Sequence, residues 1–427
     1  MAGVVDHLSA GIRPADRVSP VEDESWLMAT ASRDRWLSSG PMAAKLEAID
    51  EACQTQDFSK LVGLATSEHG LVNDEVRRRA WPILLGCADV PKQEAAASPS
   101  WRMLPEHRDE DQIRLDVDRS FIYYPHNPSA EELRSRKAEL SELITQVLRR
   151  HPYLCYFQGY HDICQVFLLV LGADRSVRAV EHISLLRIRD YMLHSLSPAL
   201  SHLHLLPSIL HAEDPKLCEH LSQTQPFFAL AATLTLYAHD IQEYGDIARL
   251  FDVLLAREAV FSVYLFAEIV LRRRDELFEI PPEEPEMLHS ILCKLPKPLE
   301  LEKLISQAVV LFEQHPPETL RMWRRISSYS VLKTARSSTQ AAQQNLAEGS
   351  LYFQKQSSQL RRAELRQLTY DVIWRYRRPA GTVGLAVLVG VFSWWIRRNP
   401  NLALAARSEG LFSPLLQGMQ RIYWGRR

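Results

Sequence analysis

Helical repeats of apolar residues, separated by prolines, constrain this fold more than any other feature of the sequence. Ile113, Val117 and Phe121 recur every four residues, which places all three on one face of a helix. Similar patterns continue to about residue 319, and prolines such as Pro152 and Pro226 interrupt them. No alternating pattern typical of a strand has a useful length here. We therefore predict an all-α domain over residues 41–319.

Helix-capping residues support this reading of the domain. Asn73 is a good N-cap, and Ser129 with Glu132 forms a capping box. On these signals we expect helices over residues 109–121, 129–150 and 163–171. Further helices are expected over residues 176–193, 198–210, 215–222, 226–240, 245–255, 258–274, 284–293 and 299–314.

The sequence outside this domain has a different character. Residues 1–40 are polar and irregular, so we expect a flexible N-terminal extension. Residues 320–378 carry serine pairs, a glutamine-rich patch and, at their end, arginines. We interpret them as a polar and basic linker.

An uncharged stretch of 18 residues begins at Pro379 and ends at Ile396, and arginines flank it on both sides. As a helix it would span about 27 Å, close to the apolar thickness of an endoplasmic-reticulum bilayer. Trp394 and Trp395 at one end fit an interfacial belt. A buried core helix is the alternative, but we predict one C-terminal transmembrane helix over residues 379–396. Residues 397–427 would be a short lumenal tail, either disordered or an amphipathic helix on the membrane surface.

Composition excludes several function classes. The net charge is −2, which gives no sign of a nucleic-acid partner. The six cysteines are scattered without a CxxC pair, as expected for reduced thiols in a cytosolic domain. No GxxxxGK[ST] or GxGxxG motif occurs, so we expect no nucleotide-hydrolysis site in the chain itself.

Two short motifs stand out within the helical region. Residues 113–119 read IRLDVDR, of the form IxxDxxR, and residues 156–159 read YFQG, of the form YxQG. Asp116 and Arg119 lie three residues apart and are neighbours on a helix surface. Arg119 would sit at the border between core and solvent, near a helix end, because Pro125 prevents continuation. Gln158 would lie on a turn before the next helix, where N–H groups and the positive dipole face outward.

Two further motifs flank this pair. Arg77 and Trp81 form RxxxW, and residues 249–252 read RLFD. From its position Trp81 is most simply a core anchor, and Arg77 a partner for an acidic neighbour. In this order, the four motifs resemble the TBC domain family of Rab GTPase-activating proteins, with Phe251 in place of the family's tryptophan.

The resemblance implies roles for individual residues. Arg119 would be an arginine finger that neutralises charge at the γ-phosphate, and Gln158 would position the attacking water. Asp116 would orient Arg119 or anchor local structure. Tyr156 would be an aromatic anchor, and Gly159 would allow close backbone approach. The supporting residues are therefore Asp116, Tyr156, Gly159, Ile113, Arg77 and Trp81.

The resemblance also implies the partner. The chain would activate, in trans, a GTP-bound Rab-family GTPase, and it would need no cofactor of its own because the Rab carries GTP and Mg²⁺. The patterns LDVDRS and YFQGYHD resemble the endoplasmic-reticulum subgroup, which acts on a Rab of early secretory, ER-to-Golgi traffic. We thus expect a single-pass protein of the endoplasmic-reticulum membrane, or of the early Golgi, with its catalytic domain in the cytosol.

Rival readings remain. A non-catalytic, membrane-anchored Rab-binding scaffold is the main alternative, although this chain keeps both the arginine and the glutamine. A protein that shapes the endoplasmic reticulum is a weaker one. His202, His204 and His211 suggest a metal only weakly, because no carboxylate pattern accompanies them. His161 and Asp162 suggest a hydrolase only weakly, because no nucleophile elbow occurs.

Overall fold

The computed structural model describes residues 40–88, 100–125 and 128–398, apart from the side chains of residues 376–382 and 396. Every regular element among these residues is a helix, which confirms the predicted all-α class. The chain divides into two compact units, residues 1–357 and residues 358–427.

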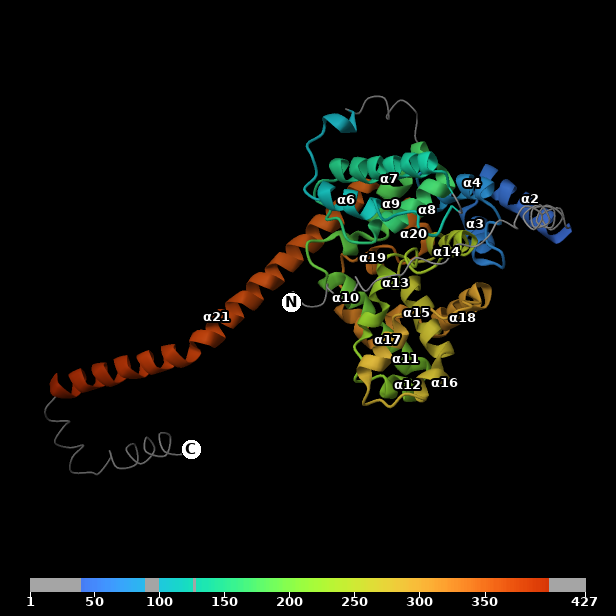
Figure 1. Cartoon of the computed structure of the whole chain (residues 1–427). Coiled ribbons are helices and arrows are strands. Elements are labelled where there is room, and N and C mark those ends of the chain that lie inside the picture. The colour runs from blue at the N-terminus through green and yellow to red at the C-terminus, as the bar shows by residue number, and fades with distance from the viewer. Residues whose placement is uncertain (1–39, 89–99, 126–127, 399–427) are drawn as a thin grey trace. The chain divides into compact units, whose positions relative to one another are not determined.

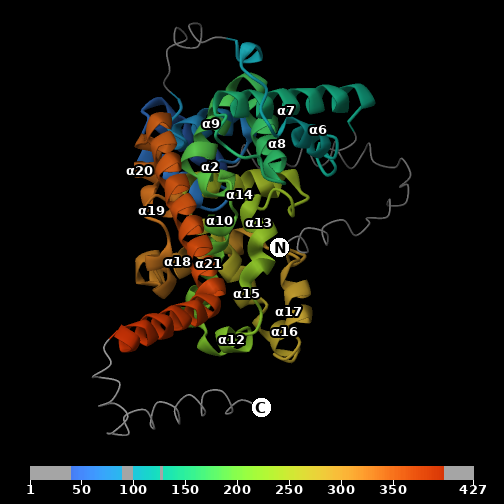
Figure 2. The same cartoon turned by 90° about the vertical axis from the view of Figure 1, so that its left-hand side faces the viewer.

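The first unit contains two groups of helices (Figures 1 and 2). The first group packs around α8, with α4, α6, α7 and α9 in contact with it. Its helices are α2 (Gly40–Gln54), α3 (Phe58–Thr66), α4 (Asp74–Leu84), η2 (Trp101–Met103), α6 (Glu110–Val117), α7 (Ala130–Arg150), α8 (Tyr160–Leu171) and α9 (Ala173–Leu186).

The second group packs around α15, which contacts α11, α13, α16 and α18. Its elements are η3 (Arg189–Met192), α10 (Ser197–Leu203), α11 (Leu206–Glu213), α12 (Pro215–His220), η4 (Pro226–Ala229), α13 (Leu230–Leu234), α14 (Tyr244–Ala256), α15 (Phe261–Arg272), α16 (Arg274–Phe278), α17 (Pro285–Leu292) and α18 (Leu301–Gln314). Helix α14 joins the two groups, because it contacts α3, α4 and α8 on one side and α18 on the other.

Local sequence signals set several of these boundaries. The Asn73 side chain accepts a hydrogen bond from the Val76 N–H at the start of α4, and Ser129 accepts one from the Glu132 N–H at the start of α7. Both predicted N-caps are confirmed. Pro82 lies inside α4, which continues to Leu84. It stays within the last turn, so few backbone hydrogen bonds are lost.

The predicted helix over residues 109–121 is shorter than expected. Helix α6 ends at Val117, and hydrogen bonds from the Arg119 and Ser120 N–H groups to the carbonyls three residues earlier form tight turns after it. Phe121 then adopts a left-handed φ of 61°, which no helix can accommodate. Phe121 is nevertheless buried, so the periodic pattern marked core positions correctly and only the helix end incorrectly.

The residues after 319 also differ from the prediction of a linker. Up to residue 357 they belong to the first unit. After η5 (Pro317–Thr319) they form η6 (Arg321–Arg325), α19 (Val331–Thr334), α20 (Ser338–Gln343) and the start of α21 (Leu346–Arg398). Val331, Ala341 and Phe353 are buried. The polar composition hid this packing because the polar side chains form buried hydrogen bonds rather than facing solvent.

Asp190 lies at the centre of those bonds. Its buried carboxylate accepts from the Ser330 hydroxyl and from the Val331 N–H, the latter at 3.1 Å. His202 Nε2 lies 2.8 Å from the same carboxylate. Nearby, the Arg189 guanidinium donates to the Tyr329 carbonyl at 2.6 Å. These bonds tie residues 329–331 to η3 and α10, so the folded unit extends well past residue 319.

Two other predictions concern segments that the structure describes in part or not at all. Among the described residues, no helix is both long enough and apolar enough to cross a membrane. The predicted span from Pro379 to Ile396 includes residues 379–382 and 396, whose side chains lie outside the described set. The extension over residues 1–40 and the tail over residues 397–427 lie almost wholly outside the described residues.

The Asp190 cluster yields a stability prediction. Ser330→Ala removes a donor to a buried carboxylate, so we expect the free energy of unfolding to fall by roughly 1.5–3 kcal/mol. Urea denaturation of a chain ending at residue 374, followed by circular dichroism, measures this loss. Ser306→Ala is the matched control, because Ser306 is exposed and bonds only within its own helix. Equal stability of the two variants would contradict the assignment of residues 320–357 to the folded unit.

Candidate functional site

Arg119 lies just beyond the end of α6 and reaches solvent. Its guanidinium pairs with Asp116, and 61% of its side chain is exposed whereas the Asp116 side chain is fully buried. Ile113, one turn earlier, is also fully buried and fixes α6 against the core. Asp116 therefore anchors the Arg119 guanidinium, while most of the side chain faces solvent and can contact a partner. This is the border position between core and solvent that the sequence predicted.

The Asp116 carboxylate collects three side-chain donors. Oδ1 accepts from Gln112 Nε2 at 3.0 Å and from Arg119. Oδ2 accepts from the Tyr156 hydroxyl at 2.9 Å. Burial, and then the Asp116 charge itself, raise the pKa of Tyr156, so this hydroxyl stays protonated and remains a donor. Three donors offset the cost of burying the carboxylate and fix its orientation.

The segment that contains Gln158 is held on its N-terminal side by two backbone N–H groups. The Tyr156 N–H donates to Asp109 Oδ2 at 2.9 Å, and the Cys155 N–H donates to the Met192 carbonyl at 2.8 Å. Gln158 itself is exposed. A fixed backbone with an exposed amide is the arrangement that a residue acting on a partner requires.

Gly159 follows directly and is required by geometry. It has a left-handed φ of 98° as the N-cap of α8, and a Cβ added there would lie 2.5 Å from Thr235 Cγ2. Any other residue would clash with Thr235 and adopt a strained backbone. Gln158 therefore sits immediately before a helix N-terminus, where the dipole favours negative charge such as phosphate.

One hydrogen-bonded path connects the two predicted catalytic segments. It runs from Arg119 through the Asp116 carboxylate to the Tyr156 hydroxyl, two residues before Gln158. The structure thus brings the IxxDxxR and YxQG motifs together, although Arg119 and Tyr156 are 37 positions apart in the sequence. Tyr156 serves as a polar link, where the sequence suggested only an aromatic anchor.

The RxxxW and RLFD motifs form a separate, buried cluster. Arg77 Nε and Nη2 each donate to the Asp252 carboxylate at 3.0 Å, and the Trp81 indole donates to it at 2.8 Å. The Leu71 N–H also donates to Asp252, at 3.0 Å. Arg77 additionally pairs with Asp74 at 2.9 Å, which confirms the predicted acidic partner. This cluster locks α4 to α14 and has no exposed group for chemistry.

Sequence reasoning missed two residues of the Arg119 cluster. Gln112 lies four residues before Asp116, and this helical spacing could have identified it. Asp109 and Tyr156 are joined only in the folded chain, so no local signal could have paired them.

The rival constellations gain no support among the described residues. His202 is buried against Asp190 rather than grouped with His204 and His211. No group of three or more possible metal ligands occurs in that part of the chain. The cysteines are free, as expected.

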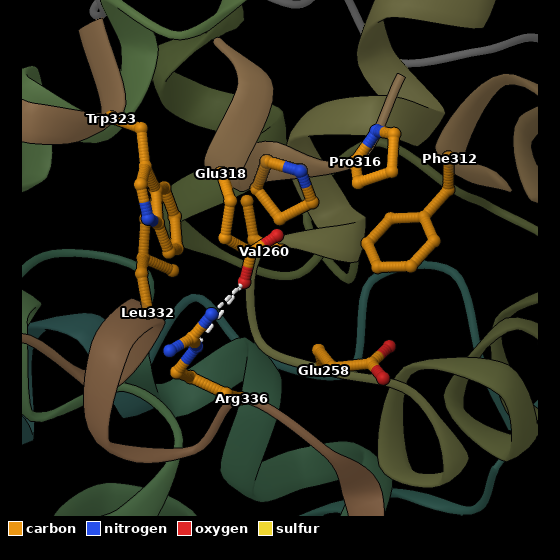
Figure 3. Close-up of a pocket in the computed structure, with 9 residues that line it drawn as sticks. Glu258, Val260, Phe312, Pro316, Glu318, Trp323, Leu332 and Arg336 are labelled. Carbon is orange, nitrogen blue, oxygen red and sulfur yellow. Dashed lines mark hydrogen bonds and ion pairs between the residues drawn. The ribbon is translucent and has the colours of Figure 1, made fainter. Parts of the chain in front are cut away.

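A hollow lined by residues of α18, η5, η6, α19 and the turn before α15 lies elsewhere in the first unit (Figure 3). Phe312 and Trp323 form opposite walls, and the Arg336 guanidinium points at Glu318. Both carboxylates there are already paired, Glu318 with Arg336 and Glu258 with Arg257. No residue of the Arg119 cluster lines this hollow, so it adds no reacting group to the site.

The described helices thus present an exposed arginine and an exposed glutamine from two segments linked by hydrogen bonds. Residues 74–278 match the model of the Rab-GTPase-TBC domain. With the relatives below, this match shows that the chain belongs to the TBC family of Rab GTPase-activating proteins.

The relatives include the GTPase-activating protein gyp10 of Schizosaccharomyces pombe, 32% identical over 290 residues, or 67% of this chain and 77% of gyp10. Human TBC1 domain family member 20 is 33% identical over 266 residues, or 62% of this chain and 65% of that protein. The chain thus spans slightly less than two thirds of the human relative. Among solved structures, the Ypt/Rab-GAP domain of Gyp1p matches with a TM-score of 0.46 at 16% identity, over 66% of this chain and 97% of that one.

The two clusters should respond differently to substitution. Asp252→Asn leaves the buried Arg77 charge poorly compensated, so we expect a loss of about 3–5 kcal/mol in the free energy of unfolding. Arg119→Ala removes one donor from the buried Asp116 carboxylate, but Gln112 and Tyr156 remain bound to it, so we expect a smaller loss of about 1–2 kcal/mol. Urea denaturation of both variants beside the unchanged chain checks this. A larger loss in Arg119→Ala would show that Arg119 holds the fold together rather than facing a partner.

Proposed function

We propose that this chain stimulates GTP hydrolysis by a Rab GTPase, and that Arg119 and Gln158 supply the groups that do so. The Rab brings GTP and Mg²⁺, so the chain provides only positioning and charge. The observation that supports this most directly is the path from exposed Arg119 through buried Asp116 to Tyr156.

Arg119 would act as the finger. Negative charge spreads over the oxygens of the γ-phosphoryl group in the transition state, and a guanidinium placed there stabilises it. Asp116 limits the positions that Arg119 can adopt before the partner arrives, which lowers the ordering cost on docking. The side chain is 61% exposed, so it can leave part of this ion pair and reach the nucleotide.

Gln158 would act on the attacking water. A side-chain amide both donates and accepts hydrogen bonds, so it can orient a water toward the γ-phosphate. Its place before the N-terminus of α8 supports this role, since the same region favours the phosphate charge. Leu115 and Ile122 lie near Arg119 in the chain and are 60% and 70% exposed, consistent with an apolar contact to the docked Rab.

We further propose that the Rab belongs to the early secretory pathway and that the chain is anchored in the endoplasmic-reticulum or early Golgi membrane. The motif patterns of the sequence support the choice of Rab. For the anchor, the support is the uncharged stretch from Pro379 to Ile396. Within its described part, the exposed apolar side chains include Val383, Leu388, Val391 and Trp394. An apolar surface of this length favours insertion into lipid.

The catalytic assignment can be tested by single-turnover GTP hydrolysis across a panel of Rabs. We expect Arg119→Ala to reduce stimulation by about 10³–10⁵, and Gln158→Ala to reduce it strongly. Arg119→Lys should fail nearly as badly, because an ammonium lacks the planar guanidinium fork. Arg114→Ala is the matched control, because Arg114 is an arginine within α6 that is 67% exposed and paired with Asp111.

The same experiment distinguishes catalysis from the main alternative, a non-catalytic Rab-binding scaffold. Tight binding to a GTP-loaded Rab without acceleration would support a scaffold instead. Stimulation that survives Arg119→Lys would contradict the finger role.

The membrane assignment can be tested by flotation with liposomes. We expect the full chain to float after a carbonate wash, because the uncharged stretch would be buried in lipid. A chain ending at residue 374 should stay in solution, and one ending at residue 398 should still float. Flotation of the shortest chain would place membrane binding elsewhere in the sequence.

A further inference from the structure

A second set of titratable groups lies behind the Arg119–Asp116–Tyr156 path. His161 is buried in the first turn of α8, with Nδ1 3.2 Å from the Tyr156 hydroxyl and Nε2 3.3 Å from Asp162 Oδ1. Asp162 Oδ2 in turn lies 3.0 Å from His239 Nδ1. The series of contacts that begins at Arg119 therefore continues through buried His161, and then through Asp162, to exposed His239.

Counting protons shows that this arrangement depends on a proton at His161 Nδ1. The Tyr156 hydroxyl has one proton, and it donates that proton to Asp116. Its oxygen can then only accept, so His161 Nδ1 must carry a proton to complete the 3.2 Å contact. Nε2 lies 3.3 Å from Asp162 Oδ1, an ion-pair contact that attracts the ring when it is charged. The imidazolium always carries the Nδ1 proton, whereas neutral His161 carries it in only one of its two tautomers.

A neutral His161 supplies the Nδ1 proton in one tautomer and lacks it in the other. If the remaining proton is on Nε2, Nδ1 becomes an acceptor and competes with Asp116 for the single Tyr156 proton. If it is on Nδ1, the Nε2 lone pair faces the Asp162 carboxylate. In the first case Asp116 loses its bond from Tyr156 part of the time. The donors that remain, Gln112 and Arg119, both bind Oδ1, which leaves Oδ2 of a fully buried carboxylate poorly satisfied.

We propose that His161, carrying a proton on Nδ1, is a positioning residue that aligns Arg119 through Tyr156 and Asp116. The proposal rests on the proposed function, since Arg119 is the group that it aligns. His161 itself touches no reacting atom. Its effect is to commit the Tyr156 proton to Asp116, so that the carboxylate presents Arg119 in one orientation.

The net effect of the surroundings is to lower the pKa of His161 below its ordinary value. Burial lowers the pKa of His161, the carboxylates of Asp162 and Asp116 oppose that shift, and the charges of His239 and Arg119 reinforce it. The hydrogen bond to Asp162 raises the pKa of the neighbouring His239. Burial raises the pKa of Asp240 to about 6, so this carboxyl titrates in the same range and must be separated experimentally.

The first test follows the protons and does not depend on any GTPase. Long-range ¹H–¹⁵N spectra of the full chain in detergent report the protonation of each histidine nitrogen, and His161→Asn assigns the signal. We expect an Nδ1-bound proton on His161 that persists as both nitrogens become protonated at low pH. Tyr156→Phe should shift the His161 titration, because it removes the acceptor. A neutral Nε2–H form that is unaffected by Tyr156→Phe would overturn the proposal.

The second test measures the pH profile of Rab stimulation, with the intrinsic hydrolysis rate of the Rab subtracted at each pH. We expect stimulation by the unchanged chain to rise as pH falls through the His161 titration seen in the spectra. His161→Asn should abolish that rise, and Tyr156→Phe should lower the maximal rate by about tenfold, the size of one lost bond to a charged group. His220→Asn is the control, because His220 bonds to the Leu277 carbonyl, away from these groups.

The outcomes separate the two proposals. Absence of any stimulation by the unchanged chain would count against the proposed function, while the spectra would still decide the proton arrangement. A pH dependence that persists in His161→Asn would assign it to Asp240 or His239 and overturn the role of His161. A Tyr156→Phe variant with an unchanged maximal rate and a raised KM would do the same, because loss of alignment should act on the chemical step.

Discussion

A buried carboxylate, that of Asp252, holds the first group of helices to the centre of the fold. It has no exposed surface and accepts hydrogen bonds from Arg77, Trp81 and the Leu71 backbone. Because α14 also contacts α3, α8 and α18, fixing it to α4 fixes the helices that flank the Arg119 cluster. A charge buried without these donors would cost several kcal/mol. Removal of one of these partners should therefore destabilise the packing of α4 against α14.

Asp116 follows the same physical pattern with a different result. Its carboxylate is equally buried, but one of its donors, Arg119, extends into solvent. A buried acceptor thereby orders a side chain that would otherwise sample many rotamers, at little cost to the rest of the fold. The Asp252 cluster holds the helices together, and the Asp116 cluster prepares one side chain for a partner.

The sequence predicted those features that depend on local spacing. The periodic apolar positions identified the buried face of α6, and Asn73 and Ser129 identified helix starts through bonds to residues three positions away. The left-handed Phe121 and the Asp109–Tyr156 bond depend on contacts between distant segments, which spacing cannot reveal. Residues 320–357 were mistaken for a linker for the same reason, since Ser330 looks solvated until Asp190 is placed beside it. Of the site, spacing predicted the exposed arginine and its acidic neighbour, whereas the hydrogen bond from Tyr156 required the fold.

The packing of residues 320–357 has a consequence for the modularity of this domain. The family match covers residues 74–278 and includes all four motifs, yet Asp190 and Arg189 within it depend on Ser330 and Tyr329 outside it. A chimera that exchanged only the matched segment with a relative would separate these buried groups from their native partners. A segment exchanged with a relative should therefore include residues 320–357 together with η3. The part of the chain that folds as one unit is longer than the part that the family model matches.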